Sequence, residues 1–332
     1  MAHASRPALG AALALILTCG SPAAAAEAAP RVVASVQPVH SLVAGVMEGI
    51  GEPTLLVGSG ASPHAYQMRP SEAKALAGAD LVVWVGEELE AFLAKPVAGL
   101  GGRARVLGLM AAPGIELLPT REGGGWEAHG DAHGDEHERE HGHGDERHEA
   151  QNEPGHHGEH DAHVWLSPAN ARAIVRAVAA ALAEVDPARK DHYAANAGAT
   201  VARLDALEGE MRAVLEPVRG RPYVVFHDAY QYLEHAFGLN AVGSITVSPE
   251  RQPSAARLAE LRGRIRREGA ACVFGEPQVA TRLVATVVEG TEAGVGELDA
   301  EGSTRIAAGP EAYFTLMRRN AKALSDCLAK PG

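Results

Sequence analysis

The sequence has no stretch of basic residues that could follow a phosphate backbone. Of its 332 residues, 30 are Lys or Arg and 42 are Asp or Glu, so the formal net charge is −12. Nucleic acid binding depends on clustered cations, and we therefore expect no nucleic acid partner. Residues 121–161 alone contain 13 acidic and 3 basic side chains. Most of the negative charge thus belongs to one segment, and the rest of the chain is nearly neutral.

Long apolar runs are also missing. The apolar stretch at residues 9–17 is too short to cross the roughly 30 Å hydrocarbon core of a membrane. With Arg6 before it and Ala24–Ala26 after it, this stretch is typical of a secretory signal peptide. We expect residues 1–26 to be that signal and to be cleaved, which predicts an exported protein. A lipid anchor at Cys19 is the alternative.

Cysteine is scarce, and only two cysteines remain after such a cleavage. Cys272 lies in an apolar run that predicts a buried strand, and Cys327 lies near the end of a helix-like segment at the C-terminus. Disulfides persist in exported proteins. A bridge between Cys272 and Cys327 is therefore one expectation, and two separate buried thiols are the alternative.

Strand-like and helix-like segments alternate along the mature chain. Short apolar runs predict strands, and between them apolar residues recur at helical spacing; the runs lie at residues 31–36, 53–57, 79–85, 223–226, 242–247 and 271–274. This order favours βα units on parallel sheets. We predict an α/β fold of two lobes, residues 27–186 and 218–332, each a parallel sheet flanked by helices.

Residues 187–217 lie between the two predicted lobes and are dominated by helix formers. Val201, Leu204, Leu207 and Met211 recur at a spacing of three or four residues. The pattern predicts one long, rigid helix that joins the lobes. Gly209 leaves the alternative of two shorter helices.

The segment 121–161 is low-complexity sequence rich in histidine. Nine of the sixteen histidines lie between Trp126 and His160, mixed with Gly, Asp and Glu. Such a tract is typical of a disordered segment that binds metal ions weakly; a linker with no specific role is the alternative. His137–His141 and His156–His160 match metalloprotease patterns, but those patterns require a regular helix, which the Gly-rich flanks do not favour.

Three histidines outside this tract lie where we expect strands to lead into helices. His64 occurs in the sequence GASPHAY, His163 in DAHVWLSP, and His227 directly after the strand-like run YVVF. The ends of parallel strands carry the binding groups of α/β folds. Singly, each residue is better explained as a structural histidine. Together, their surroundings match one family.

These stretches, with Arg69-Pro70-Ser71, Phe274–Gln278 and Gly296–Asp299, resemble the zinc-uptake receptors of ABC importers. The receptors concerned form the group whose two α/β lobes are joined by one long helix. The resemblance runs from about Val32 to Leu328. It implies a monomeric periplasmic receptor, not an enzyme, that captures Zn²⁺ and delivers it to a membrane permease. It also implies a disulfide in the zinc branch at the positions of the two mature cysteines.

The resemblance makes His64, His163 and His227 metal ligands and Asp299 a possible fourth. Pro63 stands where some zinc receptors have a glutamate, so water or Asp299 would complete the site.

Three neutral imidazoles suit zinc, whereas manganese receptors of this group generally have a carboxylate at the position of His227. A manganese or nickel receptor on the same scaffold remains an alternative. A secreted zinc hydrolase is another, although it would need a general base for which no motif lies beside the three histidines. A metal-dependent adhesin is a third.

Overall fold

The computed structural model describes residues 3, 28–58, 60–123, 125–126, 158–278, 281–302 and 305–330. The predicted signal peptide, apart from His3, and most of the histidine-rich tract lie outside the described residues. The described chain folds into two α/β lobes, each with a four-stranded parallel sheet, as the sequence predicted.

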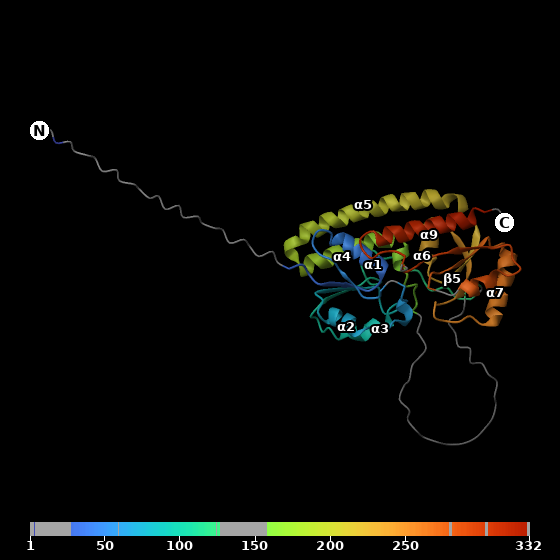
Figure 1. Cartoon of the computed structure of the whole chain (residues 1–332), viewed down its shortest axis with the longest axis horizontal. Helices are drawn as coiled ribbons and strands as arrows, with labels where there is room; N and C mark the ends of the chain where they lie inside the picture. The colour runs from blue at the N-terminus through green and yellow to red at the C-terminus, as the bar shows by residue number, and fades with distance from the viewer. Residues whose placement is uncertain are drawn as a thin grey trace, which may run out of the picture.

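The first lobe contains a sheet in the order β2-β1-β3-β4. Its strands are short and largely apolar; they are β1 (Val32–Ala34), β2 (Thr54–Leu55), β3 (Leu81–Trp84) and β4 (Arg105–Gly108). The helices are α1 (Gln37–Val46), α2 (Pro70–Ala77), α3 (Ala91–Ala98) and α4 (Pro168–Val185). Helices α1 and α4 cover one face of the sheet and α2 and α3 the other (Figure 1). Burial on both faces explains the apolar composition of β1 and β3.

The second lobe repeats this arrangement with the order β6-β5-β7-β8. Its strands are β5 (Pro222–His227), β6 (Asn240–Thr246), β7 (Cys272–Gly275) and β8 (Gly294–Glu297). Its helices are α6 (Gln231–Phe237), α7 (Ala255–Glu268), α8 (Thr281–Val288) and α9 (Ala312–Leu328). Successive residues of β5 enter different clusters, Val225 with the main core and Val224 with α7 and α8. The alternation is that of a strand covered on both sides.

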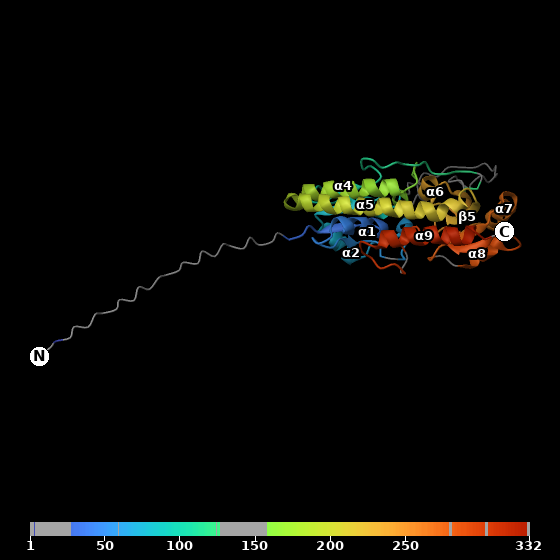
Figure 2. The same ribbon diagram turned by 90° about the horizontal axis from the view of Figure 1, so that it is seen from above.

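One helix, α5 (Lys190–Leu215), spans both lobes (Figures 1 and 2). At 1.5 Å per residue its 26 residues extend for about 39 Å. Gly209 does not interrupt it, so the prediction of a single long helix is confirmed. Single 3-10 turns flank α5 on both sides, and α9 packs along the half that reaches the second lobe.

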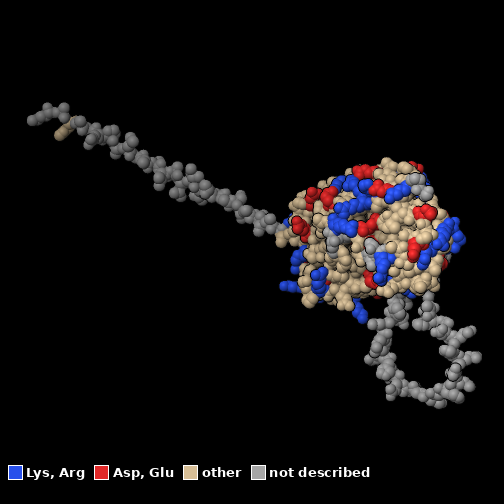
Figure 3. All heavy atoms as spheres, turned by 45° about the vertical axis from the view of Figure 1, so that its right-hand side comes forward, with Lys and Arg blue, Asp and Glu red and all other residues tan. Residues whose placement is uncertain are grey.

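Two further features of the described chain are the distribution of charge on its surface and one disulfide. On the face in Figure 3, basic and acidic side chains are interspersed. None of the described helices combines the length and apolarity needed to cross a bilayer. Cys272 of β7 and Cys327 of α9 form a disulfide, which confirms the predicted bridge.

Candidate metal centre

The three predicted histidines lie in different parts of the fold. His64 belongs to a 3-10 turn between β2 and α2, where its backbone amide donates to the Ser62 hydroxyl. His227 is the last residue of β5. His163 precedes the turn Val164–Leu166 that leads into α4. Among the described residues directly before His163, 158–162, there is an isolated bridge but no strand, so this histidine lies at a loop-to-helix junction and not at the strand end expected from the sequence.

Although they come from two lobes, these histidines converge on one point. The ligand atoms of His64, His163, His227 and Glu301 all lie within 4.8 Å of one another. The Nε2 atoms of His163 and His227 are 3.4 Å apart. Two nitrogen ligands of a tetrahedral zinc ion, with Zn–N bonds of about 2.0–2.1 Å, are separated by roughly 3.3 Å. The spacing is therefore that of two ligands of one ion.

A buried carboxylate orients His227. Nδ1 of His227 lies 2.5 Å from Oε1 of Glu276, which follows β7, and the Tyr230 hydroxyl donates to the same oxygen at 3.2 Å. Burial lowers the pKa of His227, but the charge and hydrogen bond of Glu276, together with the charges of Asp228 and Glu250, outweigh it, and the pKa lies above its ordinary value. With Nδ1–H donating to Glu276, Nε2 carries the lone pair on the side of the shared centre.

His163 has an equivalent partner in Asp161. Oδ1 of Asp161 lies 2.8 Å from Nδ1 of His163 and also accepts the His163 backbone amide at 2.9 Å. This contact turns Nε2 of His163 toward His227. Carboxylate-bound imidazoles of this kind are the usual arrangement behind a metal ion.

The fourth member of the group is Glu301, in the loop after β8. Its Oε1 lies 3.9 Å from Nε2 of His64 and has no hydrogen-bond partner among the residues that the structure describes. Burial, reinforced by nearby carboxylates that include Glu276, raises the pKa of Glu301 well above its ordinary value. A divalent cation at this point would favour the ionised carboxylate and offset the cost of burying it.

Asp299, the possible fourth ligand of the sequence prediction, lies two residues earlier in the same loop. Its Oδ1 accepts the amides of Glu301 at 3.1 Å and Gly302 at 2.8 Å, and Asn320 of α9 hydrogen-bonds its backbone on both sides. Asp299 thus shapes the turn that presents Glu301. Within the described chain the four-residue group contains Glu301 and not Asp299, and the role of Asp299 as a ligand stays a prediction.

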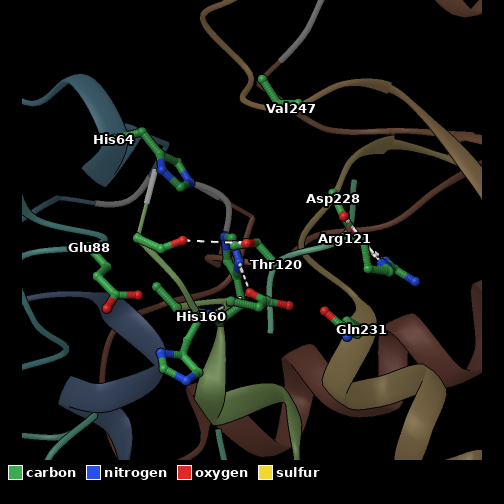
Figure 4. Close-up of a pocket in the computed structure, with 12 residues that line it drawn as sticks. His64, Glu88, Thr120, Arg121, His160, Asp228, Gln231 and Val247 are labelled. Atoms are coloured by element: carbon green, nitrogen blue, oxygen red, sulfur yellow. Dashed lines mark hydrogen bonds and ion pairs between the residues drawn. The ribbon is translucent and has the colours of Figure 1, made fainter. Parts of the chain in front are cut away.

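A cavity of about 50 Å³ opens beside the centre. Both lobes line it, with His64 and Glu88 on one side and Asp228, Gln231 and Val247 on the other (Figure 4). Pockets for organic ligands usually measure about 300–1,000 Å³. This space suits an ion with a few water molecules.

The sequence pointed to the three histidines but gave no role to Asp161, Glu276 or Glu301. Asp161 lies two residues before His163, so proximity along the chain was the only signal for it. Glu276 and Glu301 follow β7 and β8 closely. A carboxylate directly beyond a predicted strand was the available signal for Glu276, whereas Glu301 follows a strand that the sequence did not predict and had no such signal.

A sequence profile of the family described as "Zinc-uptake complex component A periplasmic" matches residues 32–327. The chain is 45% identical over 320 residues to the high-affinity zinc uptake system protein ZnuA of Brucella suis, with 94% of this chain and 95% of that protein covered. It is 36% identical over 328 residues to the protein of the same name from Yersinia pestis, with 99% and 100% covered.

The fold is also similar to a solved structure, that of the periplasmic zinc binding protein TroA from Treponema pallidum. The TM-score is 0.73, and the alignment covers 91% of this chain and 100% of that one. At 21% sequence identity, this likeness concerns the fold alone. Two parallel-sheet lobes with a helix between them are thus an arrangement that both proteins share.

Proposed function

This chain belongs to the family of the periplasmic component A of zinc-uptake complexes, and from that membership we propose that it captures Zn²⁺ and delivers it to an ABC importer. The observation that carries the proposal is the convergence of His64, His163 and His227 at the spacing of zinc ligands. Zinc accepts imidazole nitrogens with one further oxygen ligand in a tetrahedron. The protein is a receptor and not an enzyme, because its family consists of metal-binding receptors.

For the ligand set we propose His64, His163 and His227 with Glu301 as the fourth. The buried Oε1 of Glu301, which has no hydrogen-bond partner in the described part of the chain, supports this choice. Asp299 is the alternative fourth ligand. Its Oδ1 already accepts two backbone amides, which favours Glu301.

Other cargoes and chemistries fit the centre less well. Manganese prefers oxygen ligands, whereas three of the four candidate ligand atoms are imidazole nitrogens. A zinc hydrolase needs a general base beside the metal. Glu276 and Asp161 are each engaged with an imidazole Nδ1, so they orient ligands.

The family is periplasmic, and we propose the same compartment for this chain, reached through cleavage of a signal peptide at residues 1–26. We further propose that it works as a monomer and docks on the membrane permease of the importer. Residues 27–186 and 218–332 would form the two lobes and residues 187–217 the joining segment.

The direct test is to replace His227 by Ala in the mature protein and to titrate zinc against a chelator of known affinity. Loss of a ligand should weaken binding by more than the roughly 10- to 100-fold typical of residues behind ligands. His235→Ala is the matched control, because this histidine is exposed on the neighbouring helix α6. Wild-type affinity in His227→Ala would remove His227 from the site and reopen the choice of metal.

A second test separates the centre from the histidine-rich tract, whose interior lies outside the described residues. Deleting Glu127–Gly158 should remove weak metal binding and leave one tight binding event, because none of the four proposed ligands belongs to the deleted segment. Loss of the tight event would show that the primary site has been wrongly assigned.

A further inference from the structure

The chain crosses from the first lobe to the second immediately before the histidine-rich tract. At this crossing, residues 118–120 pair with residues 159–161. Pro119 and His160 form an antiparallel bridge, the amide of Thr120 donates to the carbonyl of Glu159 at 3.1 Å, and the amide of Asp161 donates to the carbonyl of Leu118 at 2.9 Å. We call this pairing the crossing ladder. It is continuous with His163, two residues farther along.

Arg121 fastens the end of the crossing ladder to the second lobe. Its Nε donates to Oδ1 of Asp228 at 3.1 Å and its Nη1 to Oε2 of Glu234 at 2.6 Å. The side chains of Arg121, Asp228 and Glu234 are only 17%, 15% and 9% exposed, so solvent does not screen these contacts as it does at a surface pair. Figure 4 shows Arg121 directed at Asp228 beside the cavity. The Trp126 ring lies against the guanidinium, with its centroid 3.4 Å from Cζ of Arg121.

A tyrosine of helix α6 makes a second link to the crossing ladder. The Tyr232 hydroxyl donates to the carbonyl of Asp161 at 2.8 Å and accepts the amide of Leu118 at 3.0 Å. It therefore contacts both sides of the ladder. Since the side chain of Asp161 holds the ring and the backbone of His163, Tyr232 acts on the metal centre through a single residue.

These contacts meet where the two halves of the metal centre come together. Asp228 directly follows His227, so Arg121 joins the segment that leads to His163 to the segment that carries His227. We propose that Arg121 and Tyr232 are positioning residues that hold His163 of the first lobe against His227 of the second. The proposal rests on the proposed function, because it assumes that these histidines bind the transported ion.

We call the four residues that make these contacts the clasp; they are Arg121, Asp228, Tyr232 and Glu234. We expect the clasp to reduce the free energy that is needed to order the two imidazoles when the metal binds. With the clasp intact, the two imidazoles are ordered before the ion arrives. Without it, the ion binds only the fraction of molecules in which both imidazoles face the centre. The apparent affinity is then the intrinsic affinity multiplied by that fraction. Residues behind metal ligands typically change affinity by about 10- to 100-fold, and we expect Arg121→Gln and Tyr232→Phe to fall in this range.

Two residues of the same chemistry provide matched controls away from the centre. Arg172 also donates to two carboxylates, Asp205 at 3.1 Å and Glu208 at 2.7 Å, and is 21% exposed. Tyr193 is a buried tyrosine whose hydroxyl donates to Asp186 at 2.7 Å. Arg172→Gln and Tyr193→Phe should lower stability to a similar degree and leave zinc affinity unchanged.

The experiment measures zinc affinity by chelator competition, the rate of zinc release and the visible spectrum of the Co²⁺-substituted mature protein. Each clasp substitution is made alone and in a His163→Ala background. If the clasp acts through His163, the substitutions lower affinity and alter the Co²⁺ bands in the wild type but cost little more in the His163→Ala variant. If Arg121→Gln does not fold, Tyr232→Phe, which loses one hydroxyl, decides the question.

The outcomes are distinguishable. Wild-type affinity in both clasp variants, or losses that add fully to that of His163→Ala, would overturn the role of the clasp and leave the proposed function standing. Equal losses in the Arg172 and Tyr193 controls would do the same, because they would indicate a general effect of stability. Failure of the unmodified protein to bind Zn²⁺ tightly would overturn the proposed function itself.

Discussion

Replacing Glu276 by Gln removes a negative charge from behind a metal ligand and keeps the shape of the side chain. Oε1 of Glu276 lies 2.5 Å from Nδ1 of His227, and the two side chains are 3% and 1% exposed. Both groups are thus shielded from solvent, and a charge-assisted hydrogen bond is about twice as strong as a neutral one. The carboxylate fixes the tautomer of His227 and makes Nε2 a better donor to the ion. An amide supplies a weaker acceptor and an NH₂ group that favours the other tautomer.

The size of the effect follows from this geometry. Outer-shell substitutions cost about 10- to 100-fold in metal affinity, or roughly 1.4 to 2.8 kcal/mol. The short distance and complete burial place Glu276→Gln in the upper part of that range. Asp161→Asn should cost less, about tenfold, because its contact with Nδ1 of His163 is longer at 2.8 Å and an Asn oxygen can still accept the His163 amide.

Chelator competition at neutral pH measures these affinities, and Glu90→Gln is the matched control. Glu90 is fully buried but accepts the amides of Val85 and Gly86 in the first lobe. An affinity of Glu276→Gln within about twofold of the wild type would refute the reasoning, since even a weak outer-shell contact exceeds this. An equal loss in Glu90→Gln would refute it as well, by showing that replacing any buried carboxyl group lowers the affinity.

Other perturbations test separate parts of the structure. Glu301→Gln should weaken zinc binding by about tenfold or more, whereas Asp299→Asn should chiefly lower the thermal unfolding midpoint, since Asp299 holds the turn. Chelator competition measures the first effect and thermal melts the second. The reverse pattern would make Asp299 the ligand. Burial raises the pKa of Glu90 from 4.5 to about 7. The folded protein therefore binds more protons than the unfolded chain between these values, and the free energy of unfolding falls by on the order of 3 kcal/mol as pH rises through this window. Urea unfolding at several pH values should show a shallower slope in Glu90→Gln than in the wild type; an unchanged slope would contradict the assignment. Reducing the Cys272–Cys327 bridge, which spans 55 residues, should lower the free energy of unfolding by about 4 kcal/mol, and equal urea midpoints with and without reductant would speak against it.

The sequence predicted best those features that have a strong local signal. The run before His227 is apolar on both faces, so composition alone indicated β5. Helix formers throughout α5 outweighed Gly209, which is simply tolerated because no atom of the described residues lies within 4 Å of where its Cβ would be. The disulfide needed only export and two remaining cysteines.

Features that depend on contacts between distant segments could not be predicted in this way. Strand β8 alternates Gly with exposed Val295 and Glu297, and so lacks the apolar run that marks a buried strand. Glu301 meets His64 only because the carboxyl ends of both sheets face the same cleft. Arg121 contacts residues of the second lobe, and Tyr232 of the second lobe contacts the segments before and after the histidine-rich tract. These contacts depend on tertiary packing, for which neither residue carries a sequence signal.

Because the candidate ligands lie at strand ends and in loops, the choice of cargo is largely independent of the scaffold. The apolar residues that stabilise each lobe lie within the sheets and under the helices, and none of them contributes a ligand. A change at His227, the last residue of β5, or at Glu301 in a loop alters the metal centre without removing a core side chain. The same framework can therefore be retuned to another ion by exchanging single residues, in evolution or in the design of metal sensors.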